Sequence, residues 1–546
     1  MFLDLEPYPT GDAAEYVLTT EAFKNHLSPS INKNDFSTFK TDFLKKKEWW
    51  SIHKPEYFDQ VEQFLSKEKK EFKETFAGIY LAKNGSLYSY HFPFYSLLNL
   101  PARILCVLLN KNPLGAFQLT NGVLILLTCA LILLTNLNIS LLWRVLISTS
   151  FFFSSVYWYI GWVHPEVMTA CFVAASLWLL WQNRFLLSLY FMIGASLQNQ
   201  PLVLMVALIA ILFLAHKNFN KKSILLLIVP GLITLLPSAF YFVLFDTFNL
   251  VKDQGFLSKE VVTFTRVFGF FFDINQGIIL AIPFAITLFP IAFVAHLRDW
   301  RDWKNTKKLI PLPLVLSAMV FSFCTMKNWN HGQAVIVRYG VWFSTIVLLY
   351  VLIWMSDKRK PIFIILGSLI GLSQIVTTLY HEKLNKFDWT WFEHKPIAKY
   401  VLGNFPDYYN PDPHIFFVRT TGKDALDTNY GPVIFKDDFD NIKKIMLHKS
   451  SLNSLAELGF DTSKSKKIFS KVNLNGWVYL NPESLPYLDY EVIDSVRNKN
   501  SIDRTIERIK ATPEWMDQIK IKAAEKSISL DSMILLDAIY ILNQEK

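Results

Sequence analysis

The stretch that decides the fold of this chain is FLLSLYFMIGASLQNQPLVLMVALIAILFLAH, residues 185–216. It is strongly apolar, but a Gln-Asn-Gln-Pro cluster at residues 198–201 interrupts it near the middle. Proline disfavours helical backbone in the residue before it, and a cluster of amides at the centre of a bilayer would need hydrogen-bond partners. We therefore predict two helices, 185–197 and 201–216, that meet at a turn formed by this cluster.

The composition sets the class of protein. Of the 546 residues, 52% are hydrophobic and 18% are charged, and the mean hydropathy is +0.25. These values exclude a single soluble domain, an extended disordered chain and a disulfide scaffold. Residues 96–380 carry 20 Lys/Arg and 8 Asp/Glu, whereas residues 1–95 and 381–546 are close to neutral. A positive surplus confined to the apolar middle argues against nucleic acid as a partner and for a membrane protein with two polar flanks.

The apolar middle predicts an all-α, polytopic membrane domain. About 20 apolar residues span a bilayer, and shorter segments do so within packed bundles. We expect ten spans, at residues 114–135, 144–160, 166–181, 185–197, 201–216, 223–245, 277–296, 309–325, 338–355 and 361–380.

The distribution of basic residues favours the break within 185–216. With ten spans, the connections on one side hold thirteen Lys/Arg and those on the other side hold five, and such an excess marks the cytoplasmic side. A single helix over 185–216 would reverse every later connection and place the basic run 298–308 outside. The break is therefore retained, and both polar flanks are expected on the extracytoplasmic side.

This threading gives three regions. Residues 1–95 form an extracytoplasmic first loop, 96–380 the transmembrane bundle and 381–546 an extracytoplasmic soluble α+β domain. Because a charged segment of this length does not cross a bilayer unaided, we expect a further transmembrane helix ahead of residue 1.

The flanks carry weaker patterns. Residues 33–76 have apolar positions that predict amphipathic helices lying on the membrane, with a solvated helical hairpin as the alternative. In the C-terminal flank we predict strands at 414–419, 432–435 and 477–480, followed by helices within 501–543.

With this topology, the unusual polar groups all fall on the extracytoplasmic side. They lie in six short segments: Thr10–Tyr16, Tyr90–Pro93, His164–Glu166, Gln198–Pro201, Phe271–Gly277 and Asn328–Tyr339. Five of them have a structural alternative. Asp12, Glu166 and Asp273 could cap helices, Arg338 could anchor a helix at the interface, and His91 before Pro93 could be an interfacial turn residue. Caps would scatter over both faces, so the shared side favours a functional site.

Metal and thiol chemistry are not indicated. The four cysteines, Cys106, Cys129, Cys171 and Cys324, lie in apolar runs without a C-x-x-C pair, which argues against disulfides and a zinc site. The C-terminal flank holds no nucleotide-binding glycine loop and no nucleophile motif.

Taken in order, these segments resemble the GT-C superfamily of polyprenyl-phosphate-sugar-dependent glycosyltransferases. The resemblance covers about residues 8–380 and is nearest to bacterial members similar to protein O-mannosyltransferases and to the aminoarabinose transferase that modifies lipid A. It implies a multi-pass protein of the bacterial inner membrane that moves a sugar from a polyprenyl-phosphate donor to a hydroxyl of a protein, lipid A or glycan acceptor on the outer face. A cofactor is not implied, and a divalent metal is not required.

The resemblance assigns the acid in the first loop, Asp12, as catalytic base. Many members have two adjacent acids there, whereas here Ala13 follows and Glu15 is the next carboxylate. On a helix Glu15 would lie about one turn from Asp12, which makes it the second catalytic candidate, with the role of orienting the acceptor. The chemistry itself requires one base for the attacking hydroxyl and positive charge for the departing phosphate. The substrate-binding candidates are His91, Glu166, Gln200, Asp273, Trp329, His331 and Arg338. Of these, Arg338 and the two histidines are the candidates for binding the phosphate.

Two other classes remain open. A transporter or lipid flippase would carry internal repeats and polar residues near mid-bilayer, and the sequence contains only Glu166 as an acid within any expected span. A non-catalytic envelope scaffold is the third interpretation, because the residue after Asp12 is not acidic.

Overall fold

The structure is a computed structural model. It describes residues 13–44, 55–67, 71–76, 78–135, 139–298, 312–329, 335–358, 360–382, 392–423, 426, 432–448, 476–480, 502–503, 505–526 and 528–544. The chain divides into two compact units, one formed by residues 1–262 and 267–391 and the other by residues 263–266 and 392–546.

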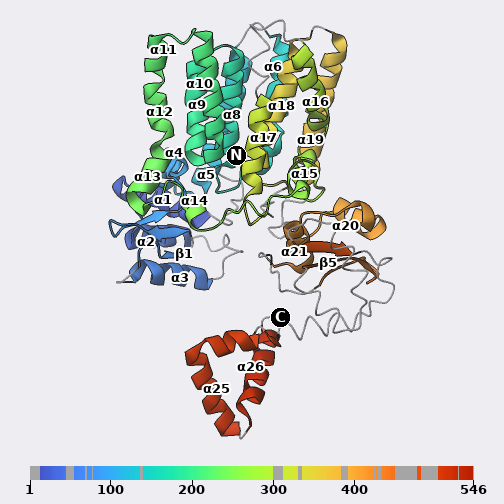
Figure 1. Ribbon diagram of the computed structural model, residues 1–546. Helices are drawn as coiled ribbons and strands as arrows, with labels where there is room; N and C mark the ends of the chain where they lie inside the picture. The colour runs from blue at the N-terminus through green and yellow to red at the C-terminus, as the bar shows by residue number, and fades with distance from the viewer. Residues whose placement is uncertain are drawn as a thin grey trace. The chain divides into compact units, whose positions relative to one another are not determined.

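The first unit is mainly helical (Figure 1). Its helices after the first loop are α4 (Phe94–Leu108), α5 (Gly115–Leu134), α6 (Leu141–Phe152), α7 (Ser155–Trp158), α8 (Glu166–Trp181), α9 (Phe185–Gln198), η2 (Gln200–Leu202), α10 (Val203–His216), α11 (Lys221–Leu226), α12 (Ile228–Thr234), α13 (Leu236–Phe245), α14 (Leu250–Asp253), α15 (Phe264–Phe272, whose first residues belong to the second unit), η3 (Ile278–Leu280), α16 (Pro283–Arg298), α17 (Leu312–Cys324), α18 (Gly340–Ser356) and α19 (Pro361–Glu382).

Two of these helices are long and apolar enough to cross a membrane, α5 and the segment Pro361–His381 of α19. A third span results if Lys221–Thr234 and Leu236–Phe245, which meet at a bend of 41°, are counted as one. The remaining apolar helices have 10–17 residues. The described residues therefore contain two or three candidate spans by length and composition, fewer than the ten that we expected.

Two of the expected spans differ in a way that local chemistry explains. The segment 144–160 is divided into α6 and α7, because the Ser154 side chain accepts a hydrogen bond from the Val156 amide and starts a new helix. The segment 277–296 begins with the 3-10 turn η3, and α16 starts only at Pro283. Apolarity alone does not register such caps and turns.

The predicted break within 185–216 is confirmed. α9 ends at Gln198, η2 forms the turn and α10 starts at Val203. α9 and α10 pack side by side (Figure 1), so the stretch forms a helical hairpin and not one long helix.

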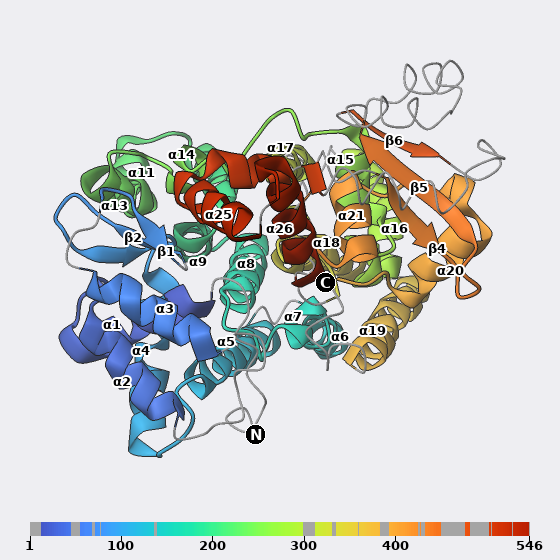
Figure 2. The same ribbon diagram turned by 90° about the horizontal axis from the view of Figure 1, so that it is seen from below.

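The first loop folds against the start of the bundle. It contains α1 (Ala13–His26), α2 (Lys33–Leu44), α3 (Pro55–Ser66) and a small antiparallel sheet of β1 (Thr75–Phe76), β2 (Ile79–Leu81) and β3 (Leu87–Ser89). Phe36 and Phe39 of α2 and Val61 and Phe64 of α3 share one buried cluster with α1 and the sheet, and Figure 2 shows these helices side by side. Their apolar faces are thus already covered by protein, which favours the helical-hairpin interpretation over helices lying on a membrane.

The second unit contains a small antiparallel sheet in the order β4 (Val433–Lys436), β5 (Ile442–His448) and β6 (Trp477–Leu480). α20 (Pro396–Asn404) and α21 (Pro413–Thr421) lie against it (Figure 2), η6 (Pro406–Tyr408) connects these two helices, and α25 (Pro513–Lys526) packs on α26 (Leu530–Gln544). The strand predicted at 414–419 is wrong. Asp412 accepts a hydrogen bond from the His414 amide and Pro413 occupies the first helical position, so a helix begins here.

His414 makes the stability of the second unit depend on pH. Burial lowers the pKa of His414 to about 4, although the nearby Asp412 carboxylate opposes this; the unfolded value is about 6.5. The unfolded chain therefore binds an extra proton between pH 6.5 and 4, and the free energy of unfolding should fall by about 3 kcal/mol as the pH drops through that window.

The change should be visible as lost hydrogen-exchange protection of the α21 amides in the full-length protein at pH 5 relative to pH 7, after correction for intrinsic exchange. His414→Asn should flatten this dependence. The exposed His216 of the first unit provides a matched control, because His216→Gln should leave it unchanged. Equal slopes for the wild type and His414→Asn would contradict the assignment.

Candidate functional site

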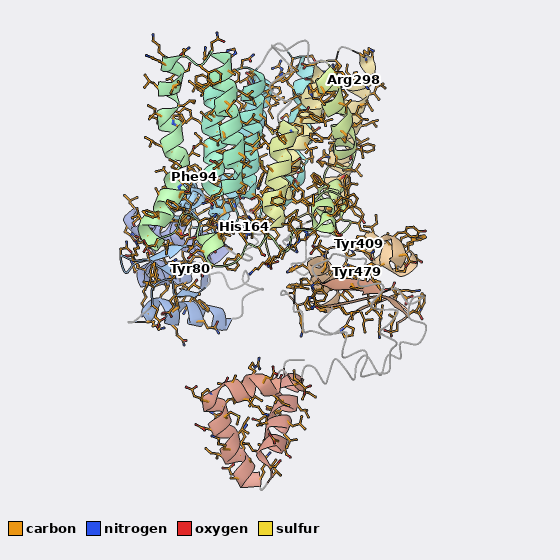
Figure 3. The ribbon with its side chains drawn as sticks, viewed as in Figure 1. Tyr80, Phe94, His164, Arg298, Tyr409 and Tyr479 are labelled. Carbon is orange, nitrogen blue, oxygen red and sulfur yellow. The ribbon has the colours of Figure 1, made fainter. Side chains whose placement is uncertain are left out.

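A cavity of about 400 Å³ lies at one end of the helices of the first unit. It is formed where α8, α10 and α18 begin and where α9 and α17 end. Figure 3 labels His164 at this end of the helices and Arg298 at the opposite end. Its polar lining residues come from segments far apart in the sequence: Tyr16, His91, Glu166, Gln198, Asn199, Gln200, Asn249, Ser322, Arg338 and Tyr339.

Glu166 is the carboxylate of the cavity. It is the first residue of α8, follows Pro165 and is 3% exposed. Its Oε2 lies 4.0 Å from Nδ1 of His164, and among the described residues no hydrogen bond reaches this oxygen. A buried acceptor left without a hydrogen bond costs about 1–3 kcal/mol, whereas a hydroxyl of a bound ligand would satisfy it.

Glu15 positions His91. Glu15 is 2% exposed, and its Oε2 accepts a hydrogen bond from Oγ of Ser89 at 2.9 Å and lies 3.1 Å from Nδ1 of His91. His91 lines the cavity and its ring lies 5.3 Å from the Tyr16 ring, centroid to centroid. The carboxylate thereby fixes the orientation of the imidazole ring.

Gly78 is what lets Glu15 reach this position. Its φ is +75°, and an added Cβ would lie 2.1 Å from Oε1 of Glu15. Any side chain here would displace the carboxylate, so the turn between β1 and β2 requires glycine.

Arg338 brings positive charge to the same cavity. It precedes α18 and is 9% exposed, and its guanidinium lies 5.2 Å from the centre of the Tyr339 ring, with Nη2 3.3 Å from the Tyr339 hydroxyl. A largely buried guanidinium with five N–H donors is suited to an anionic oxygen group.

The turn between α9 and α10 contributes amides. Oε1 of Gln198 accepts a hydrogen bond from the Tyr95 amide at 3.2 Å, and Oε1 of Gln200 accepts one from Nδ2 of Asn249 at 2.9 Å. These bonds supply the partners that a polar cluster within apolar helices needs, and they fix the turn against α4 and α14.

Asp273 and Trp329 do not line the cavity. Oδ1 of Asp273 accepts hydrogen bonds from the amides of Asn275 and Gln276, so Asp273 organises its own loop. The backbone carbonyl of Gln276 accepts a hydrogen bond from the Val337 amide. The side chain of Gln276 donates one to the carbonyl of the fully buried Trp329. Both residues therefore support the segment that carries Arg338, and we had expected them to bind substrate.

One side of the cavity continues onto an outward-facing helix surface. Val203 and Leu204 of α10 line it and are 40% and 42% exposed. Tyr241 and Trp342, which the sequence analysis did not single out, add aromatic surface. They lie within apolar helices, where the sequence does not distinguish a lining residue from a core residue. The cavity thus combines a polar, charged end with an apolar flank.

Of the expected site residues, His91, Glu166, Gln200 and Arg338 line this single cavity, and Glu15 contacts it through His91. Asp12 and His331 lie outside the described residues. Within the described part of the chain, no group of three or more His, Cys, Asp or Glu side chains could hold a metal ion.

Neither a protein-family model, nor a curated protein, nor a solved structure matches this chain.

Proposed function

We propose that this protein is a membrane glycosyltransferase of the GT-C type, which transfers a sugar from a polyprenyl-phosphate donor to an acceptor hydroxyl at the extracytoplasmic surface. The single observation that carries the proposal is the meeting of Glu166, His91 and Arg338 in one cavity with an apolar flank on α10.

The two halves of the cavity match the two halves of such a donor. A polyprenyl-phosphate sugar has a polar, anionic head and a long apolar tail. Arg338 provides positive charge for the phosphate, and His91, whose ring Glu15 orients, provides a hydrogen-bonding group. Glu166 and Gln200 provide acceptors for sugar hydroxyls, while the exposed face of α10 offers the tail a surface that continues into lipid.

The reaction would need little else from the protein. The acceptor hydroxyl loses its proton to a carboxylate, for which we propose Asp12, and its oxygen forms a bond to the anomeric carbon. The bond between that carbon and the phosphate oxygen breaks, and the electron pair leaves with the phosphate. This leaving group needs charge neutralisation and not protonation, which is the role of Arg338.

The proposal includes about ten membrane crossings. The connections at the cavity end of the helices are those with few basic residues, and the connections at the other end hold most of the Lys and Arg. Under the positive-inside rule the cavity faces away from the cytoplasm, where polyprenyl-linked sugars could meet envelope acceptors.

The direct test is donor consumption by the full-length protein in lipid nanodiscs. A panel of polyprenyl-phosphate sugars is supplied with an envelope extract as acceptor, and released polyprenyl phosphate is measured by mass spectrometry. We expect release with at least one donor, and we expect Asp12→Asn to abolish it while donor binding persists, because the amide keeps the shape of the base but not its basicity.

Asp4→Asn is the matched control, since it removes a carboxylate of the same N-terminal segment. Absence of both donor binding and release across the panel would refute the transferase. Wild-type turnover by Asp12→Asn would instead remove Asp12 from the role of base.

A further inference from the structure

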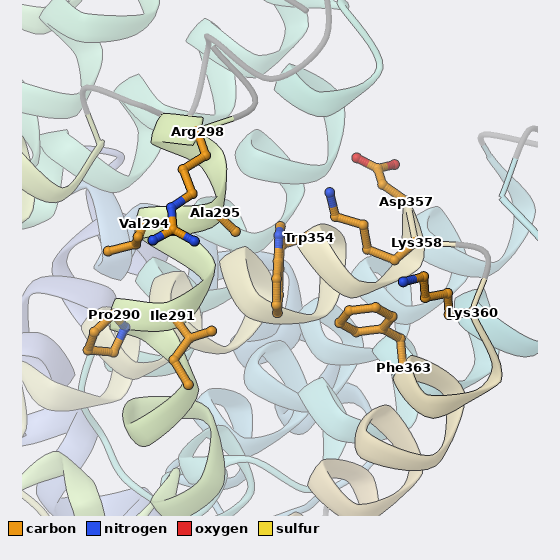
Figure 4. Close-up of a pocket in the computed structure, with 10 residues that line it drawn as sticks. All are labelled: Pro290, Ile291, Val294, Ala295, Arg298, Trp354, Asp357, Lys358, Lys360 and Phe363. Atoms are coloured by element: carbon orange, nitrogen blue, oxygen red, sulfur yellow. The ribbon is translucent and has the colours of Figure 1, made fainter.

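A second, open cavity of about 770 Å³ lies at the opposite end of the first unit, where α16 and α18 end and α19 begins. Figure 4 shows its lining, in which Arg298 projects from α16 while Lys358 and Lys360 come from the turn between α18 and α19. Among the described residues, Asp357 is the one acidic residue of the lining. Three cations against one anion give the described part of the rim a positive charge.

The floor of the cavity is apolar. Ile291 and Val294 of α16 line it and are 56% and 45% exposed, and Phe363 lines it from α19. In a bilayer these exposed faces would meet acyl chains. The cations lie at the rim above an apolar wall. A phospholipid has the matching order, with a charged headgroup above apolar acyl chains.

Trp354 supplies an independent indication of a ligand. It lines the cavity, is 6% exposed and packs edge-on against Phe363 with ring centroids 5.3 Å apart. Its indole Nε1 is buried and has no hydrogen-bond partner among the described residues. Figure 4 shows the Trp354 ring standing between Arg298 and Lys358. A buried indole N–H usually finds an acceptor, and no acceptor is supplied here by the described protein.

We propose that this cavity binds the headgroup phosphate of an anionic phospholipid from the surrounding bilayer. Arg298 and Lys358 neutralise the phosphate, and the Trp354 indole N–H donates to one of its oxygens. The acyl chain lies against Ile291 and Val294. This proposal is independent of the transferase activity, because it uses none of the residues of the candidate functional site.

The hydrogen-bonding groups of the cavity lining indicate an anionic ligand. Arg, Lys and the Trp indole can donate hydrogen bonds but cannot accept them, so a phosphate, which only accepts, matches all three. A zwitterionic headgroup would add an ammonium group next to Lys358 and Lys360. The apolar wall below the cations favours a lipid over free phosphate, which would leave that wall without a partner.

The test uses the full-length protein, released from nanodiscs containing equal amounts of phosphatidylglycerol and phosphatidylcholine with the same acyl chains, and native mass spectrometry to count retained lipids. We expect phosphatidylglycerol to be retained in preference to phosphatidylcholine. Arg298→Gln should lower its affinity roughly fivefold, the effect of one cation near a membrane surface. Trp354→Phe, which removes only the N–H and keeps the aromatic bulk, should lower it in the same direction.

Arg184→Gln is the matched control, because Arg184 is an exposed arginine that precedes α9 outside this cavity and, by the threading, on the same side of the membrane. It should leave retention unchanged. Equal retention of the two lipids, or wild-type selectivity in Arg298→Gln, would overturn the proposal. Displacement of the lipid by millimolar inorganic phosphate would identify a free-anion site and overturn the lipid assignment. If Trp354→Phe fails to fold, Arg298→Gln alone decides.

Discussion

Replacing Arg338 with Ala should lower kcat/KM for the polyprenyl-phosphate donor by roughly 10²–10³-fold, the usual loss when one group that stabilises developing negative charge is removed. The guanidinium lines the cavity and is 9% exposed, so water cannot readily substitute for it. The measurement is the initial rate of polyprenyl-phosphate release as a function of donor concentration in nanodiscs.

Two variants give this prediction a matched comparison. Arg338→Lys keeps the charge but loses the planar pair of donors, and should recover part of the rate. Lys327→Ala removes a neighbouring cation that is exposed and does not line the cavity, and should retain wild-type kinetics. An unchanged donor dependence in Arg338→Ala would remove Arg338 from the phosphate site and weaken the proposed function with it.

A buried ion pair between α1 and α4 should have a large effect on the stability of the protein. Glu21 of α1 and Arg103 of α4 form an ion pair in which the side chains are 1% and 2% exposed. Glu21 also pairs with Lys24. Its removal takes a counter-charge away from the buried Arg103 guanidinium, so Glu21→Ala should lower the free energy of unfolding by about 3–5 kcal/mol. The loss should appear as a lower thermal midpoint of the detergent-solubilised protein.

A double variant distinguishes the loss of charge pairing from the loss of packing. If the lost counter-charge lowers the stability, Glu21→Leu/Arg103→Met should recover much of the free energy of unfolding, because well-packed apolar residues can replace a buried pair. The partly exposed pair formed by Lys40 and Glu62 is the control, and Glu62→Ala should cost at most about 1 kcal/mol. A Glu21→Ala variant as stable as the control would show that the pair contributes little.

Much of the helix pattern could be predicted from apolar runs, including the turn at residues 198–201. α4 was not anticipated as a helix of the bundle, because Ser96, Asn99 and Arg103 interrupt its hydropathy. All three side chains are buried. Ser96 donates a hydrogen bond to the carbonyl of Tyr16 and Arg103 pairs with Glu21, both in α1. Asn99 instead donates to the carbonyl of Tyr95 in its own helix. Hydropathy averages cannot detect that kind of compensation, since it depends on tertiary partners.

The sequence predicts the candidate site only as far as the expected membrane topology groups its residues. His91, Glu166 and Arg338 were grouped because the ten-span threading places all of them on one side, and they line one cavity. Topology does not say which way a side chain points. The threading places Asp273 on the same side too, but its carboxylate accepts hydrogen bonds from the amides two and three residues onward, a local preference of aspartate that competes with any ligand role.

α18 extends from the candidate functional site to the second cavity. Its N-terminal residues, including Trp342, border the candidate site, and Trp354 near its C-terminus borders the second cavity. The helix is buried from Gly340 to Met355, and tightly packed interiors transmit displacement instead of absorbing it. A small shift of α18 along or about its axis would therefore change the shape of both cavities together.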